Sequence, residues 1–169
     1  ISNASIQRIC EVLNEESTIE NTENPKTDVP DGSIDFNGVS FKYHAGAEKY
    51  ALTDIDLHIK SGETIGIIGG TGSSKSSLIQ LISRLYDATE GEVLVGGSNV
   101  KDYDIETLRN AVSVVLQKNV LFSGTIKENL RWGDMNATDE ELVRVCKLAQ
   151  ADEFINTLPD GYDTHIEQG

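Results

Sequence analysis

The sequence has few cysteines and prolines and little positive charge. Its 169 residues include two cysteines, three prolines and one tryptophan, and 14 Lys and Arg stand against 28 Asp and Glu, which gives a formal net charge of −14. Cys10 and Cys146 are far apart, with no C-x-x-C pair or histidine cluster, so zinc is not indicated and reduced thiols in the cytosol are the simplest interpretation. The excess of acid disfavours nucleic acid as a partner, because neutralising phosphates requires clustered Lys and Arg.

Long apolar runs are also missing. No stretch approaches the ~20 residues that span a bilayer, and no signal peptide precedes the first predicted helix. A role at a membrane would therefore come through another segment or partner. The hydrophobic content of 38% and charged content of 25% are ordinary for a soluble globular protein, and 169 residues are enough for one domain with its own core.

The most informative stretch is rich in glycine and serine and joins a strand pattern to a helix pattern. Residues 69–77 read GGTGSSKSS, follow the apolar run Ile65–Ile68, and lead into apolar residues of helical spacing between Leu78 and Leu85. Small side chains let successive backbone N–H groups approach a triphosphate, and the helix N-terminus adds its positive end. The stretch therefore predicts a phosphate loop, as in the motif G-x-x-x-x-G-K-[ST]. The glycines alone would also suit a turn without a ligand.

Individual loop residues have expected tasks. Lys75 would place its ammonium group on the β- and γ-phosphate oxygens, and the hydroxyl of Ser76 would bind Mg²⁺. Ser74 departs from the motif, which has its second glycine there. If that position requires a positive φ, the serine costs roughly 1 kcal/mol or more, whereas a negative φ makes the cost small. The predicted phosphate-binding residues are Gly70, Thr71, Gly72, Ser73, Ser74, Lys75, Ser76 and Ser77.

Composition and periodicity divide the chain into four predicted segments. Residues 1–15 carry apolar side chains at helical spacing and form a helix with one apolar face. Residues 16–32 are polar, and between Glu11 and Asp31 seven acids stand against one lysine, which predicts an extended or mobile acidic connector. Residues 33–117 form the compact core, and residues 118–169 are mostly helical.

The compact part begins with an antiparallel β layer. Ile34–Phe36 and Val39–Tyr43 alternate in opposite parity across Asn37-Gly38, which predicts two short strands or one strand with a bulge. Ile55–Ile59 alternates again, and Glu92–Val95 is a further strand candidate.

Two other apolar runs are continuous rather than alternating. Ile65–Ile68 and Val112–Leu116 are typical of strands buried on both faces of a parallel sheet, and the helix expected over residues 75–86 would cross back over that sheet. Asp104 can cap a short helix. Beyond Gln117 the pattern turns helical, with capping boxes at Thr125–Glu128 and Thr138–Glu141. The prediction is an α/β fold: a P-loop NTPase core with an antiparallel β subdomain and a partial α-helical subdomain.

Four stretches together resemble the nucleotide-binding domain of ABC transporters of the exporter type, and the resemblance covers essentially the whole chain. They are Phe41-Lys42-Tyr43, about 26 residues before the loop, then residues 69–77, Val115-Leu116-Gln117, and residues 121–130, which read LFSGTIKENL. The last is the most discriminating, because in these exporters a glutamine followed by L-F-x-x-T-I-x-x-N marks the start of the helical subdomain.

The resemblance implies roles for residues outside the loop. Tyr43 would stack on adenine, for which a ring face is a suitable platform; taken alone, it would be a core residue at a strand end. Gln117 would reach Mg²⁺ and the attacking water, although by itself it would be a solvent-facing polar residue. Residues 1–15 would be the linker helix from a membrane domain, or a surface helix. Lys118–Phe122 would line the groove for a coupling helix, or be core of the helical subdomain.

Cofactors and partners also follow from the resemblance. ATP and Mg²⁺ would bind, a second nucleotide-binding domain, identical or different, would complete the site, and a transmembrane domain would attach through its coupling helices at the cytoplasmic face of the cell membrane. The family's LSGGQ segment, general base and switch histidine are expected C-terminal to Gln168-Gly169. Residues 1–169 alone should therefore be nearly inactive, while ATP hydrolysis by the intact protein would power export.

Two other functions stay open at this point. Ser74 suits a degenerate nucleotide-binding regulatory site of an asymmetric exporter pair, which binds ATP without efficient turnover. An unrelated phosphate-loop GTPase or kinase would leave Tyr43 and residues 121–130 without an explanation.

Overall fold

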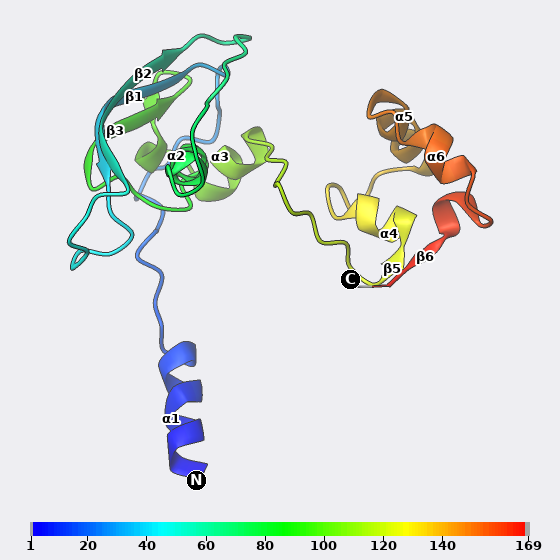
Figure 1. The fold of residues 1–169 in the computed structure, drawn as a ribbon, viewed down its shortest axis with the longest axis horizontal. Coiled ribbons are helices and arrows are strands. Elements are labelled where there is room, and N and C mark those ends of the chain that lie inside the picture. The colour runs from blue at the N-terminus through cyan, green and yellow to red at the C-terminus, as the bar shows by residue number, and fades with distance from the viewer. Residues whose placement is uncertain (1, 168–169) are drawn as a thin grey trace. The chain divides into compact units, whose positions relative to one another are not determined.

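The computed structural model describes residues 2–167, in two compact units, Ile1–Ser113 and Val114–Gly169 (Figure 1). Ile1 and residues 168–169 lie outside the described residues, and with them the outer ends of the predicted segments 1–15 and 118–169. Residues 2–167 include no helix that could cross a lipid bilayer.

The first unit is built on a four-stranded antiparallel sheet with the strand order β2-β1-β3-β4 (Figure 1). Its strands are β1 (Ile34–Phe41), β2 (Leu52–Ile59), β3 (Glu90–Val95) and β4 (Ser98–Asn99). The predicted antiparallel layer is confirmed. The pairing of β1 with β2 shifts between Phe36 and Val39, where Gly38 has a φ of 56°, so the change of parity is a bulge within one strand.

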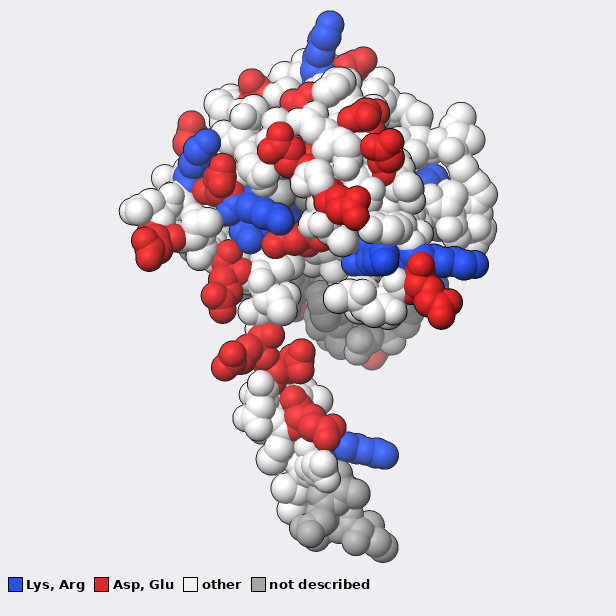
Figure 2. Space-filling model, turned by 90° about the vertical axis from the view of Figure 1, so that its left-hand side faces the viewer, with Lys and Arg blue, Asp and Glu red and all other residues white. Residues whose placement is uncertain are grey.

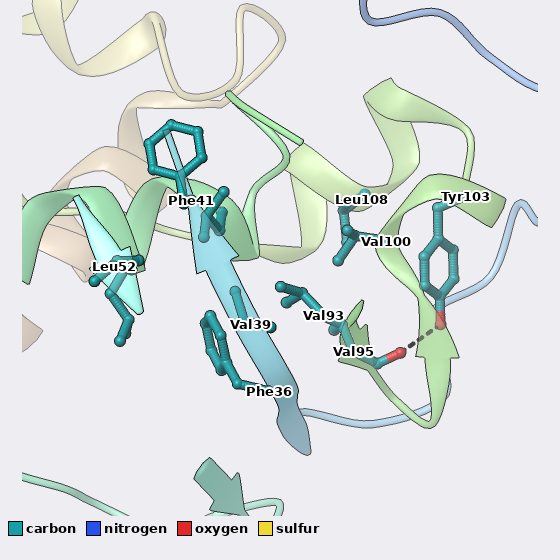
Figure 3. Packing of buried hydrophobic residues seen from close by; sticks show 11 residues of the cluster. Phe36, Val39, Phe41, Leu52, Val93, Val95, Val100, Tyr103 and Leu108 are labelled. Atoms are coloured by element: carbon teal, nitrogen blue, oxygen red, sulfur yellow. Dashed lines mark hydrogen bonds between the residues drawn. The ribbon is translucent and has the colours of Figure 1, made fainter. Parts of the chain in front are cut away.

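The core of the first unit lies between this sheet and the helical segments of the same unit. Figure 3 shows the ring of Tyr103, which is fully buried, with its hydroxyl donating a 2.8 Å hydrogen bond to the carbonyl oxygen of Val95 (Figure 3). A buried phenol needs such a partner. The remaining core residues come from the strands, from α2 (Lys75–Ile82), from η1 (Val100–Asp102) and from α3 (Ile105–Ala111): Phe36, Val39, Phe41, Leu52, Leu78, Leu81, Val93, Val95, Val100 and Leu108.

Helix α2 is shorter than the sequence predicts. It ends at Ile82 rather than near Tyr86, because Arg84 adopts a φ of 48°, which an α-helix cannot accommodate. Arg109 of α3 donates to the carbonyl oxygens of Ser83 (3.3 Å) and Arg84 (2.9 Å). These bonds satisfy carbonyl groups that the end of a helix leaves without partners.

The acidic connector is extended and is attached to the core. The backbone of Lys26 donates to the carbonyl oxygen of Asp102 (2.8 Å) and accepts from the amide of Asp104 (2.9 Å). The side chain of Asn21 accepts from the amide of Ile105 (2.9 Å) and donates to the carboxylate of Asp104 (2.7 Å). Helix α1 (Ser2–Leu13) precedes the connector and exposes the apolar side chains of its stripe.

Neither of the two predicted central strands forms. Ile65–Ile68 and Val112–Leu116 have no regular strand structure, and Ile68 and Val115 are 99% and 89% exposed. A strand forms only when a neighbour receives its backbone hydrogen bonds, and among residues 2–167 the paired strands bond to one another and not to these runs. The sequence predicts these strands because continuous apolar runs are typical of strands buried on both faces, and residues 2–167 do not provide that burial.

The second unit is mostly helical. Its elements are β5 (Gly124–Thr125), α4 (Ile126–Arg131), α5 (Asp139–Leu148), α6 (Asp152–Asn156), η2 (Gly161–Asp163) and β6 (His165–Ile166). Both predicted capping boxes are confirmed, at Thr125 with Glu128 and at Thr138 with Glu141. An ion-pair network joins α4 to α5, in which Lys127 lies 2.9 Å from a carboxylate oxygen of Asp139 and Arg131 contacts the other.

Candidate nucleotide-binding site

The predicted phosphate loop leads directly into the N-terminus of α2. The first hydrogen bond of the helix runs from the amide of Leu78 to the carbonyl oxygen of Ser74 (3.1 Å), so Lys75, Ser76 and Ser77 form the first turn. Amides of a first turn have no partner within the helix. Four α-helices follow α2 within the described residues, and a side chain caps the N-terminus of three of them, α3, α4 and α5. At the N-terminus of α2, by contrast, Ser74 makes no capping hydrogen bond. The open N-terminus of α2 is suited to an anion.

The ammonium group of Lys75 lies within the loop. It donates to the carbonyl oxygens of Gly69 (2.7 Å) and Gly70 (2.9 Å) and to the hydroxyl of Ser73 (3.1 Å). The loop thus curls around one positive charge, and the same donors would serve the oxygens of a phosphate.

Ser74, which stands where the motif has glycine, adopts a positive φ. Its φ and ψ are 59° and 23°, in the left-handed region that favours glycine, and Gly72 also has a positive φ, of 84°. The serine therefore costs on the order of 1 kcal/mol relative to a residue without Cβ. The loop keeps the left-handed turn despite this cost.

Tyr43 lies against the first turn of α2. Its hydroxyl and that of Ser77 are 2.6 Å apart, and its ring is half exposed. The rings of Phe41 and Tyr86 flank it, with centroids at 4.9 and 5.2 Å. The predicted base platform and the predicted phosphate loop are therefore adjacent. The contact of Tyr86 with Tyr43 is not predicted from the sequence, in which the only signal is that an aromatic residue stands shortly after the helix.

The exposed hydroxyl of Ser76 is an oxygen ligand of the kind that Mg²⁺ prefers. Residues 2–167 hold no cluster of three His, Cys, Asp or Glu side chains that could bind a metal. A magnesium ion would therefore be held by Ser76 together with the phosphates of a nucleotide and water, as is usual for Mg²⁺. The residues present therefore fit a magnesium ion, provided that a nucleotide is bound with it.

Gln117 belongs to the second unit, where it is exposed in an irregular segment. Its contact with Mg²⁺ stays a prediction.

The motif at residues 121–130 is organised by Asn129. Its side-chain oxygen accepts from the amide of Phe122 (2.8 Å), and its amide group donates to the carbonyl oxygens of Phe122 (2.9 Å) and Thr125 (3.0 Å). Leu121 and Phe122 are 49% and 52% exposed, so they are not core of this unit, and the ring of Phe122 contacts Trp132 with centroids 5.1 Å apart. The hydrogen bonds of Asn129 with the backbone of Phe122 explain the spacing between these two residues in the motif.

Acidic side chains are spread over the face that Figure 2 shows and outnumber the basic ones there (Figure 2). With a net charge of −14, the chain as a whole repels a nucleotide. Attraction has to come from local groups, namely the ammonium group of Lys75, the amides of α2 and a bound cation.

Comparisons with known proteins identify the family to which the chain is similar. A family model described as ABC transporter matches residues 52–168. Two relatives from Staphylococcus aureus, strains NCTC 8325 and bovine RF122, bear the name of multidrug export ATP-binding/permease protein; each is 47% identical over 139 residues, which make up 82% of this chain and 24% of the relative. The chain thus spans about a quarter of their length.

A solved structure of a bacterial Atm1-family ABC exporter with ATP bound is also similar. Its TM-score is 0.87 at 29% identity, over 96% of this chain and 29% of that one. The predicted α/β fold class, a P-loop NTPase core with an antiparallel β subdomain and a partial helical subdomain, is confirmed.

Proposed function

The chain belongs to the ABC transporter family, as a nucleotide-binding domain of the exporter type, and we propose that it binds ATP with Mg²⁺ and that the intact protein hydrolyses ATP to export a substrate across a membrane. One observation carries the proposal: Lys75 donates three hydrogen bonds inside a loop that ends at the uncapped N-terminus of α2. A phosphate placed there would meet a charge and a row of amides.

The side chains of the first unit have distinct tasks in this proposal. Lys75 and the amides of the first turn bind and orient the β- and γ-phosphates, and Tyr43 holds the adenine ring. Ser76 would hold Mg²⁺, which when bound neutralises charge on the phosphate oxygens. Phosphoryl transfer depends largely on this positioning and charge stabilisation.

Partners and location are parts of the same proposal. A second nucleotide-binding domain would complete the site, and a transmembrane domain would attach through coupling helices, close to the exposed pair Leu121 and Phe122. The site would then lie at the cytoplasmic face of a cell membrane. We expect residues 1–169 alone to turn over ATP negligibly, because the general base and the LSGGQ segment are contributed by other residues in this family.

The alternative, a regulatory site without efficient turnover, is suggested by the strained Ser74 alone. We do not adopt it, because the relatives are named as export ATP-binding/permease proteins.

Hydrolysis of magnesium ATP by the intact protein tests the proposal. The Lys75→Ala variant should lose turnover by at least about a hundredfold, since it removes a charge aimed at the reacting phosphates. Lys60→Ala, which removes an exposed lysine at the end of β2, is the matched control and should retain turnover. Unchanged turnover in Lys75→Ala, or a preference for GTP over ATP, would contradict the proposal.

A further inference from the structure

The half-exposed ring of Tyr43 is held at several points although it lies in an irregular segment. Tyr43 follows β1 by two residues, and no regular strand or helix includes it. Its hydroxyl forms the 2.6 Å hydrogen bond with the hydroxyl of Ser77. Its ring is edge-to-face with Tyr86, at an interplanar angle of 89°, and with Phe41, at 71°.

Two of these contacts, those with Ser77 and Phe41, come from buried residues of regular elements. Ser77 is 3% exposed and lies in the first turn of α2, while Phe41 is 1% exposed and belongs to the core. The rings of Phe41 and Tyr86 also contact each other, with centroids 5.4 Å apart. The edge-to-face pairs that Tyr43 forms with Phe41 and Tyr86 are favourable geometries for aromatic rings. The three rings and the hydroxyl of Ser77 therefore form one connected cluster.

We propose that Ser77 and Tyr86 are positioning residues that hold the ring of Tyr43 in a fixed orientation beside the phosphate loop, so that the base and the phosphates of a nucleotide meet a preformed site. The inference rests on the proposed function, because it assigns Tyr43 to the base. The hydroxyl of Ser77 thereby couples recognition of the base to the phosphate loop.

The effect expected from such positioning is moderate. Ordering a mobile side chain on binding lowers affinity, and a ring that is already ordered avoids that loss. Removing the hydroxyl bond while keeping the ring should weaken ATP binding by about 3- to 10-fold. Inorganic tripolyphosphate has no base, so its binding should be insensitive to the orientation of Tyr43.

A double-mutant cycle in the intact protein tests the proposal. The variants are Tyr43→Phe, Ser77→Ala and their combination, and the readouts are the dissociation constants of magnesium ATP and of magnesium tripolyphosphate. Tyr50→Phe is the matched control, because it removes a phenol hydroxyl that donates to Glu90 and has no hydrogen bond with Ser77. Ser77→Thr keeps the hydroxyl and should restore binding, and Tyr86→Leu should weaken ATP binding selectively.

The expected result is that Tyr43→Phe weakens ATP binding by about 3- to 10-fold, leaves tripolyphosphate binding unchanged, and has no further effect when Ser77 is already alanine. The proposal is overturned if Tyr43→Phe binds ATP like the wild type, if its effect persists in the Ser77→Ala background, or if both ligands are weakened equally. A wild type that binds neither ligand would instead overturn the proposed function, so the two failures are distinguishable.

Discussion

The carbonyl oxygen of Ser74 accepts the first hydrogen bond of α2, from the amide of Leu78 at 3.1 Å, while Ser74 itself has a φ of 59°. The residue that starts the helix is therefore in a conformation that disfavours its own side chain. Glycine stands at this position in the phosphate-loop motif, and the Ser74 side chain makes no capping hydrogen bond to α2 that would compensate for the change.

Replacing Ser74 with glycine should stabilise the first unit. Relief of the left-handed strain is partly offset by the greater entropy of glycine in the unfolded chain, so we expect a gain of about 0.5–1 kcal/mol in the free energy of unfolding. Urea unfolding of the intact protein measures this gain. Ser74→Ala keeps the Cβ and should show no gain; equal gains in both variants would mean that strain is not the cause.

Replacing Asn129 with alanine should loosen the backbone at Phe122. The variant loses three hydrogen bonds at a partly solvated site. Each bond contributes no more than about 0.5–1.5 kcal/mol to stability, because water can replace it. Trp132 is the single tryptophan of this chain and contacts Phe122, so its fluorescence reports the change.

We expect a red-shifted emission in Asn129→Ala and a smaller shift in Asn129→Asp, which keeps the acceptor oxygen. Asn156→Ala, at the end of α6, is the control. Identical spectra for the wild type and Asn129→Ala would disprove the role of Asn129.

The stability of the second unit should depend on pH through Asp139. Hydrogen bonds from Lys127 and then Arg131 hold the pKa of Asp139 below its ordinary value of 3.8. A lowered pKa in the folded state stabilises the fold above the unfolded pKa, and this contribution is lost as the pH falls through the folded value.

Asp139→Asn should therefore lower protection of the α5 amides from hydrogen exchange at neutral pH, and its difference from the wild type should shrink as the pH falls below the ordinary pKa of 3.8. Glu140→Gln removes a charge from the same helical turn and controls for net charge. A difference that stays constant over this range would exclude the ion pairs as its cause.

Features that depend on neighbouring residues could be predicted from the sequence. The capping boxes at Thr125 and Thr138 form as expected, because each needs only a side chain three residues away. The bulge in β1 follows from a change of alternation at Gly38. The phosphate loop is recognisable for the same reason, since its donors lie in one short stretch.

Features that depend on residues far apart in the sequence could not be predicted from it. The apolar character of Ile68 and Val115 indicates burial, but no pattern in the chain says which strands would cover them, and here both are exposed. The φ of Ser74 is not encoded in the residue type, and the bond between Tyr43 and Ser77 joins residues 34 positions apart. The connector was predicted to be extended or mobile, and only the structure shows that Asn21 and Lys26 attach it to the core.

The most direct measurement is a titration of the intact protein with labelled ATP in the presence of magnesium. The proposed site predicts saturable binding that Lys75→Ala weakens by at least about tenfold, because a charged donor to phosphate is lost, and that Lys60→Ala leaves unchanged. Absence of saturable binding, or equal affinity in the wild type and Lys75→Ala, would contradict the account of residues 69–77 as a phosphate loop.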